Sequence, residues 1–174
     1  MAQLDFKRIL CPVDLSGFSL DALKLAVDIA RASGAALYVM HAVDNPFDEL
    51  YMSSIGQADP AALGLYQRRP LRRAGIVAAI KGHSEVLLKQ FAHDWVTPSK
   101  KVRYIVKTGN PFEAILDTAE ERRADLIVLA THGRTGIKRI LIGNVAEKIV
   151  RHAPCPVLIV NARAARGRGR GGAR

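Results

Sequence analysis

The residues best suited to chemistry in this chain lie in a glycine-rich stretch that follows an apolar run. Residues 126–129 predict a buried strand, and residues 130–144 then include Gly133 and Gly143 before a helix expected to open at Asn144. Glycines let a backbone approach an anion closely, and the unpaired N–H groups of a helix N-terminus attract negative charge. The stretch therefore predicts a site for a nucleotide or another phosphate ligand, although the same glycines would also serve a simple turn.

A second candidate is Asp14, which follows Pro12 and Val13 at the end of the first expected strand. Ligands of open parallel sheets bind beyond the carboxyl ends of the strands, where the strand order reverses. If the first and fourth strands are neighbours, their ends meet in one crevice with the end of the second strand near Ala42. Asp14 would there accept hydrogen bonds from a ribose hydroxyl or an adenine amine. Alternatively, or in addition, it caps the loop before Ser16.

Alternating strand and helix signals must position these residues. Strands are expected at 6–11, 36–40, 102–106, 125–130 and 157–160, with helices after Ser16, across 71–95, after Asn110 and from Asn144. Pro12 is expected to break the first strand, and the third strand to lie near an edge of the sheet. Strict alternation predicts an α/β fold with an open parallel sheet and helices on both faces.

The expected helix ends carry capping signals. Ser16 is a favoured N-cap, and Gly34 is a C-terminal stop. Asn110 and Asn144 each precede a glutamate by three residues, the spacing of a capping box, and a proline follows Asn110 at the first helical position. Residues 45–70 are rich in proline and glycine and are expected to form a long connection.

Composition narrows the class of protein. The 174 residues most simply form one domain, and no apolar run approaches the roughly 20 residues needed to span a bilayer. Removal of residues 163–174, which hold five arginines and no acidic residue, lowers the net charge from +10 to +5. Half of the basic excess therefore belongs to this tail. Cys11 and Cys155 are expected to be buried free thiols, and with no export signal seen the cytoplasm is the expected location.

Catalytic and metal sites are less well supported. His132 beside the glycine loop is a candidate general base, but a structural role is favoured for it. His41 is not part of a cluster with metal-ligand spacing, so no metal site is expected. No dedicated nucleophile can be identified, which favours a binding module over an enzyme and leaves slow ATP hydrolysis open as a by-product of binding.

Four segments together resemble the universal stress protein family. They read Ile-Leu-Cys-Pro-Val-Asp at 9–14, Thr-His-Gly-Arg-Thr-Gly at 131–136, Gly-Asn-Val-Ala-Glu at 143–147 and Arg-His-Ala-Pro-Cys-Pro-Val at 151–157. The resemblance spans residues 6–161 and implies a Rossmann-like, five-stranded parallel sheet in the order 3-2-1-4-5. It also implies a homodimer paired through the last strand, which begins at Pro156 and ends at Val160. An exposed apolar edge strand independently favours such pairing.

The ATP-binding branch of that family carries the pattern Gly-x2-Gly-x9-Gly-Ser/Thr. Gly133 and Gly143 match it here, whereas Ala130 and Asn144 depart from its first and last positions. The resemblance implies ATP or AMP as ligand, with or without Mg²⁺. It assigns the adenosine side to Pro12, Val13, Asp14 and Ala42, and the ribose and phosphates to Leu129, Ala130, Gly133, Gly143, Asn144 and Val145, with Arg134 adding positive charge nearby.

Three hypotheses follow for the function. The leading one is a dimeric stress-response protein, with a domain over residues 1–161 that binds an adenine nucleotide as a regulatory ligand. The second is a dimeric scaffold of the same fold whose pocket is empty or differently filled. The third is a nucleic-acid-associated protein that acts through the Arg/Gly-rich tail at 162–174, whose arginines could contact phosphates without sequence preference. For that tail, a solvated disordered extension is the favoured reading.

Overall fold

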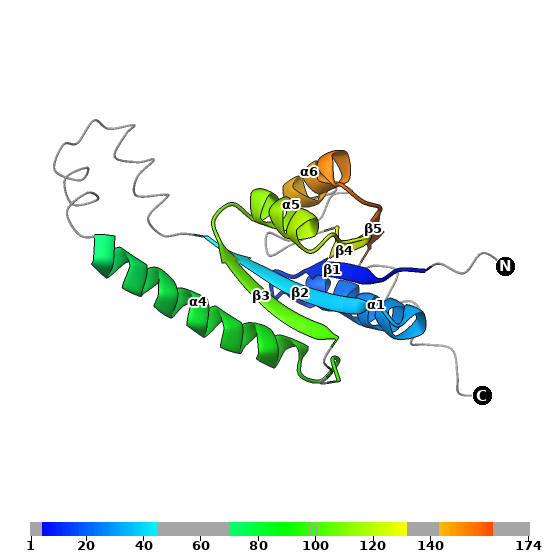
Figure 1. Cartoon of the computed structure of the whole chain (residues 1–174), viewed down its shortest axis with the longest axis horizontal. Coiled ribbons are helices and arrows are strands. Elements are labelled where there is room, and N and C mark those ends of the chain that lie inside the picture. The colour runs from blue at the N-terminus through cyan, green and yellow to red at the C-terminus, as the bar shows by residue number, and fades with distance from the viewer. Residues whose placement is uncertain (1–4, 45–69, 98, 100, 132–142, 162–174) are drawn as a thin grey trace.

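The computed structural model describes residues 5–44, 70–97, 99, 101–131 and 143–161. The predicted alternation of strands and helices is confirmed (Figure 1). The described elements are β1 (Arg8–Pro12), α1 (Gly17–Ser33), β2 (Ala36–Val43), α4 (Pro70–Ala92), β3 (Val102–Thr108), α5 (Pro111–Glu121), β4 (Leu126–Ala130), α6 (Asn144–His152) and β5 (Val157–Val160).

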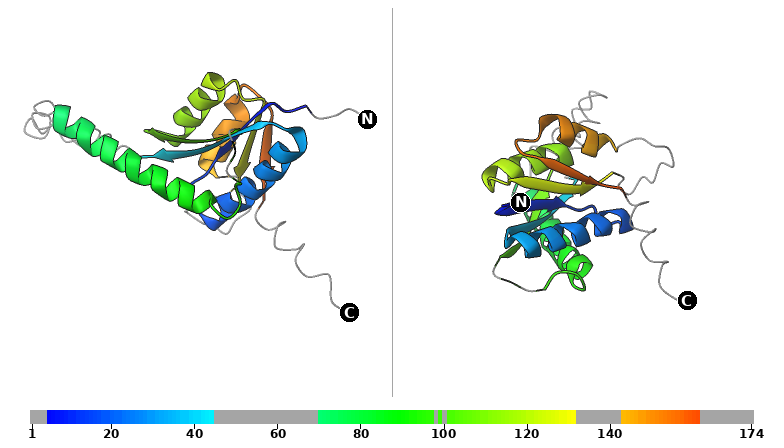
Figure 2. Two further views of the ribbon diagram at one scale, coloured as in Figure 1. Left: turned by 60° about the horizontal axis from the view of Figure 1, so that its bottom comes forward. Right: turned by 90° about the vertical axis from the view of Figure 1, so that its right-hand side faces the viewer.

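The five strands form one parallel sheet in the order β3-β2-β1-β4-β5, as expected. Helices α1 and α4 cover one face, and α5 and α6 cover the other (Figure 2). β3 lies at one edge of the sheet, as its alternating pattern predicted, and β5 lies at the other. None of the helices in the described ranges is both long and apolar enough to span a membrane.

Two apolar cores hold the layers together, one on each face of the sheet. Along β1, Ile9 and Cys11 pack into the core under α1 and α4, while Leu10 packs into the core under α5 and α6. All three side chains are fully buried, as is typical of a central strand in a parallel sheet. Burial of each such side chain contributes about 1.5–3 kcal/mol, so the core fixes the ends of the central strands.

The predicted helix ends are largely confirmed. The hydroxyl of Ser16 accepts a hydrogen bond from the backbone N–H of Ser19 at the start of α1, and Gly34 ends that helix with a left-handed φ of 69°. The side-chain oxygen of Asn110 accepts the N–H of Phe112 at 2.9 Å, with Pro111 at the first position of α5. These caps fix where the first turns of α1 and α5 lie.

Two expectations from the sequence need correction, and others concern residues that the structure does not describe. β1 starts at Arg8 and includes Pro12, because a proline at a strand end gives up only one ladder hydrogen bond. Cys11 is buried as expected, but Cys155 is only half-buried between Pro154 and Pro156. The long connection, the glycine loop with His132, and the tail lie outside the described residues.

Candidate functional site

The carboxyl ends of β1, β2 and β4 lie side by side, as the crevice hypothesis required. β1 pairs with β2 on one side and with β4 on the other. After β1 the chain turns to α1 on one face of the sheet, and after β4 it continues to α6 on the opposite face. The strand order therefore reverses between β1 and β4, which is where open α/β sheets bind ligands.

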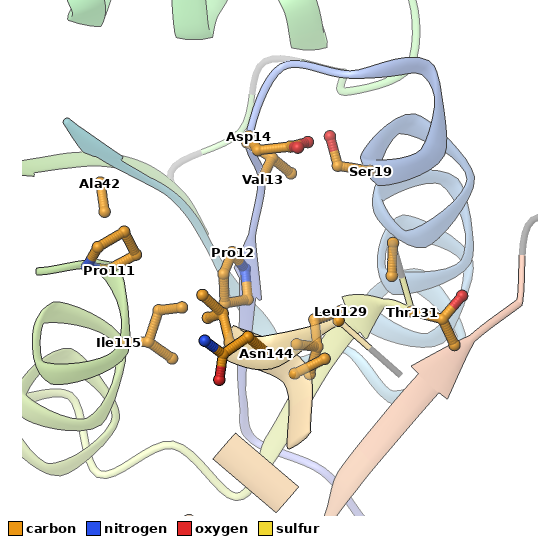
Figure 3. Close-up of a pocket in the computed structure, with 14 residues that line it drawn as sticks. Pro12, Val13, Asp14, Ser19, Ala42, Pro111, Ile115, Leu129, Thr131 and Asn144 are labelled. Atoms are coloured by element: carbon orange, nitrogen blue, oxygen red, sulfur yellow. The ribbon is translucent and has the colours of Figure 1, made fainter. Parts of the chain in front are cut away.

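A pocket of about 370 Å³ occupies this reversal point (Figure 3). That volume falls within the usual range for sites that bind small molecules. The pocket is lined by the ends of three strands and the first turns of α1, α5 and α6. The lining residues are Pro12, Val13, Asp14, Ser19, Ala42, Pro111, Ile115, Leu129, Ala130, Thr131, Gly143, Asn144, Val145 and Ala146.

The structure brings together all the predicted site residues that it describes. These nine residues are Pro12, Val13, Asp14, Ala42, Leu129, Ala130, Gly143, Asn144 and Val145. The other two, Gly133 and Arg134, lie outside the described residues.

The sequence reasoning missed five lining residues, and most of them share one physical origin. Ser19 and Pro111 belong to the first turns of α1 and α5, and Ala146 belongs to the first turn of α6. In a parallel α/β sheet, the helix N-termini lie at the same edge as the carboxyl ends of the strands. The first turns of the expected helices could therefore have been added to the candidate list from the topology alone. Thr131 and Ile115 complete the wall.

Asp14 caps the loop before Ser16 and also lines the pocket. One carboxylate oxygen, Oδ1, accepts the Ser16 N–H at 3.1 Å and the Ser16 hydroxyl at 2.6 Å. The loop-capping interpretation is therefore confirmed. The same side chain also lines the pocket, where its carboxylate and the Ser19 hydroxyl point toward one another (Figure 3). Among the described lining residues, Asp14 is the only one with an ionisable side chain.

The start of α6 differs from the prediction by one residue. The N-cap is Gly143, which has no side chain to make a capping bond, and Asn144 is the first helical residue. The expected Asn144 capping box is therefore wrong, because the chain enters the helix one residue before the asparagine. The N–H groups of the first helical turn, from Asn144 to Ala146, have no intrahelical acceptor. They lie at the pocket wall and carry the positive end of the helix dipole.

Gly143 is held against the end of β4. Its N–H donates to the Thr131 carbonyl oxygen at 2.7 Å, and the Thr131 N–H donates to Val160 at 3.1 Å. A Cβ on Gly143 would lie 3.0 Å from that Thr131 oxygen, closer than side chains normally approach a carbonyl. The glycine at this position therefore has a structural reason, namely the close approach of two backbone segments that places α6 at the pocket.

The remaining lining is mostly apolar. Ala42 of β2 and two residues of α5, Pro111 and Ile115, face the same space as Leu129 and Val145. A mostly apolar pocket with a few polar groups suits a small molecule that has both an apolar and a polar part. No group of three or more His, Cys, Asp or Glu that could hold a metal ion occurs among the residues described.

Comparison with known proteins identifies relatives along nearly the whole chain. The model of the universal stress protein family matches residues 5–161. Universal stress protein MJ0531 of Methanocaldococcus jannaschii is 35% identical over 156 residues, which cover 89% of this chain and 82% of that protein. The fold also resembles the solved structure of protein MJ0577 of the same organism, with 23% identity, a TM-score of 0.69 and coverage of 91% of this chain and 97% of that one.

A universal stress protein solved in complex with cAMP is a further structural neighbour. It is 24% identical, with a TM-score of 0.53, over 90% of this chain and 98% of that chain. At these identities the solved structures establish a shared fold, and the residues of the pocket must be judged on their own chemistry.

Proposed function

The chain belongs to the universal stress protein family, and we propose that it is a dimeric stress-response protein that binds ATP or a related adenine nucleotide as a regulatory ligand. The observation that carries this proposal is the convergence of the nine described candidate residues on one pocket, at whose wall α6 begins with an N-cap, Gly143, that has no side chain to cap the helix. One universal stress protein of the same fold is known in complex with cAMP, an adenine nucleotide, which supports this ligand class.

The two ends of the pocket suit the two ends of a nucleotide. Pro12, Val13 and Ala42 offer an apolar surface for the adenine, and Asp14 would accept a ribose hydroxyl or the adenine amine. The backbone N–H groups at the start of α6 would bind phosphate oxygens, as helix N-termini do in other nucleotide sites. α1 and α5 are capped by Ser16 and Asn110, so their first turns compete less well for an anion.

If ATP is the ligand, Mg²⁺ would be held mainly by phosphate oxygens and water. Asp14 is the one carboxylate of the described lining, and Mg²⁺ commonly binds through one or two carboxylates plus substrate phosphates. We infer binding rather than turnover, because no nucleophile with an adjacent general base is evident in the described pocket.

Thermal unfolding with and without ligand tests the proposal. A nucleotide present at 100 times its Kd stabilises the folded state by about 2.7 kcal/mol. For a chain of this size that raises Tm by roughly 5–10 °C. We expect this shift with ATP and Mg²⁺, and a null result at millimolar ATP would overturn the nucleotide claim.

Substitutions at Asp14 make the test specific to the site. Asp14→Ala should abolish the ligand-induced shift, and Asp14→Asn, which keeps an oxygen for the Ser16 cap, should reduce it. Both changes lower the stability of the free protein through the cap, so the ligand-induced shift, and not the absolute Tm, is compared. Asp28→Ala, on the exposed side of α1, is the matched control and should retain the full shift.

A dimeric scaffold that does not bind nucleotide is the second candidate. It is favoured by Ala130 and Asn144, which differ from the first and last residues of the Gly-x2-Gly-x9-Gly-Ser/Thr pattern. Both residues line the pocket, so their side chains would meet any ligand there. The double variant Ala130→Gly with Asn144→Ser distinguishes the candidates. If it binds ATP and the parent chain does not, the scaffold interpretation is correct.

We further propose that the dimer forms through β5, the outer strand of the sheet. The carbonyls of Pro156 and Val160 accept hydrogen bonds from the N–H groups of Ile127 and Thr131. Backbone groups of alternate residues in a strand point to opposite sides, so those of Val157 and Ile159 point away from β4, to the open edge. Ile159→Pro removes one outward N–H and should shift the protein to monomer in sedimentation experiments. Ile159→Ala loses similar packing but keeps the N–H and should remain dimeric; a monomeric parent would refute the idea.

A further inference from the structure

His41 is a buried polar side chain beside the pocket, although it does not line it. It lies on β2 between Met40 and the pocket residue Ala42, and only 8% of its surface is exposed. Its ring nitrogen Nδ1 lies 2.7 Å from the carbonyl oxygen of Val13. A carbonyl can only accept a hydrogen bond, so Nδ1 carries the proton and donates it.

The end of β2 forms hydrogen bonds with both the N–H and the carbonyl of Val13. The Val13 N–H donates to the Met40 carbonyl at 2.8 Å, continuing the pairing of β1 with β2. The chain then leaves the sheet for α1, and the His41 side chain binds the Val13 carbonyl at the point where the strand ladder ends. The orientation of the peptide between Val13 and Asp14 is therefore set by two successive residues of β2.

The turn that follows is under conformational strain. Leu15 has a φ of 62°, in the left-handed region that residues with a Cβ rarely adopt. Such a conformation persists only where the surroundings impose it. Downstream of Leu15, the hydrogen bonds from Ser16 to Asp14 Oδ1 hold the turn, and upstream the bond between His41 and Val13 holds it.

We propose that His41 is a positioning residue for the nucleotide site, acting through the Val13 carbonyl to impose the turn that presents Asp14 to the ligand. This inference rests on the proposed function for its effect on binding. Its structural half, the control of the turn by His41, does not require any ligand. Without the imidazole, the Val13 carbonyl loses its donor, and the strained turn has other conformations in which Asp14 is displaced from the pocket.

Two substitutions of His41 separate the effect of the hydrogen bond donated to Val13 from the effect of side-chain packing. His41→Leu fills a similar volume but has no donor, whereas the side-chain N–H of His41→Asn can reach the same carbonyl. Leu37→Val serves as a control, because it loosens the buried start of β2 at the end of the sheet away from the nucleotide pocket. All proteins are studied well below their unfolding temperatures, so that general destabilisation does not enter the result.

The first measurement is amide hydrogen exchange of the free proteins. Exchange at Ser16, whose N–H is bound by Asp14, should be about tenfold faster in His41→Leu and close to the parent rate in His41→Asn and Leu37→Val. The second is the Kd of a fluorescent adenine nucleotide. It should rise about tenfold in His41→Leu, the expected consequence of leaving a buried acceptor unpaired, and recover in His41→Asn.

The outcomes distinguish the two claims. Unchanged exchange in His41→Leu overturns the inference, whether or not the parent binds nucleotide. Faster exchange with an unchanged Kd also overturns it, because the turn would then not govern the presentation of Asp14. Absence of nucleotide binding by the parent refutes the proposed function, and the exchange data then still decide whether His41 holds the turn.

Discussion

The contact between Gly143 and Thr131 makes a quantitative prediction for Gly143→Ala. The backbone of Gly143 has φ −57° and ψ 148°, which alanine adopts without strain, so the effect must come from the added Cβ. That atom would lie 3.0 Å from the Thr131 carbonyl oxygen, whereas ordinary contacts begin at about 3.4 Å. The two segments must therefore separate by about 0.4 Å.

This separation weakens the contact between the two backbone segments. It would stretch the 2.7 Å hydrogen bond from Gly143 to Thr131 to about 3.1 Å, near the upper end of a good N–H···O bond. A weakened hydrogen bond and local overpacking together cost about 1–2 kcal/mol. For a domain of this size, Tm should fall by roughly 2–8 °C. The start of α6 would move with Gly143, so the affinity for the proposed nucleotide ligand should fall as well.

Urea and thermal unfolding measure the predicted loss, with Gly17→Ala as the matched control. A Cβ added at Gly17 would meet no atom within 4 Å, so this substitution should be neutral or stabilising by about 0.4–1 kcal/mol. If Gly143→Ala proved as stable as Gly17→Ala, the close approach of the two backbones would not constrain residue 143. The glycine would then have to be explained by the ligand alone.

Two further predictions concern titrating groups. Burial raises the pKa of the Cys11 thiol from 9.0 to about 12, so at pH 8 it should react with a thiol reagent roughly a thousandfold more slowly than an unperturbed cysteine. Half-buried Cys155 should be labelled first in the native protein, and both thiols after unfolding; rapid labelling of native Cys11 would contradict its placement. The side-chain hydrogen bond from Lys107 lowers the pKa of Glu121, so the pair stabilises the fold above the unfolded glutamate pKa and less as pH falls. The destabilisation caused by Glu121→Gln should accordingly shrink on acidification in urea titrations, and a pH-independent difference would refute the assignment.

Sequence reasoning succeeded where one local signal decides the outcome. Ser16, Gly34 and Asn110 end or begin helices as expected, because each supplies its own cap or backbone conformation. It failed at Asn144, because the helix starts one residue earlier than expected, after Gly143, whose N–H is bound by the Thr131 carbonyl 12 residues before it. The capping pattern could not reveal that tertiary contact.

The pocket residues likewise fall into those that the sequence predicts and those that it does not. Pro12, Asp14 and Ala130 could be predicted because strand ends in a parallel sheet share one edge, and the strand order was inferred from the resemblance. Ile115, which lies beyond the first turn of α5, was missed because its contribution depends on how closely α5 packs against the crevice. The hydrogen bond from His41 to Val13 was also invisible, since it joins a side chain to a backbone atom 28 positions away.

The placement of Asn144 changes what its departure from the motif means for binding. At the first helical position its side chain does not cap the helix, and the phosphate donors expected there are backbone N–H groups, which any residue supplies except proline. A serine hydroxyl at this position would add one hydrogen bond, worth about 0.5–1.5 kcal/mol. Asn144→Ser alone should therefore tighten nucleotide binding by no more than roughly tenfold, measured as a Kd by calorimetry. A much larger gain would show that the side chain, and not the helix N-terminus, dominates phosphate binding in this protein.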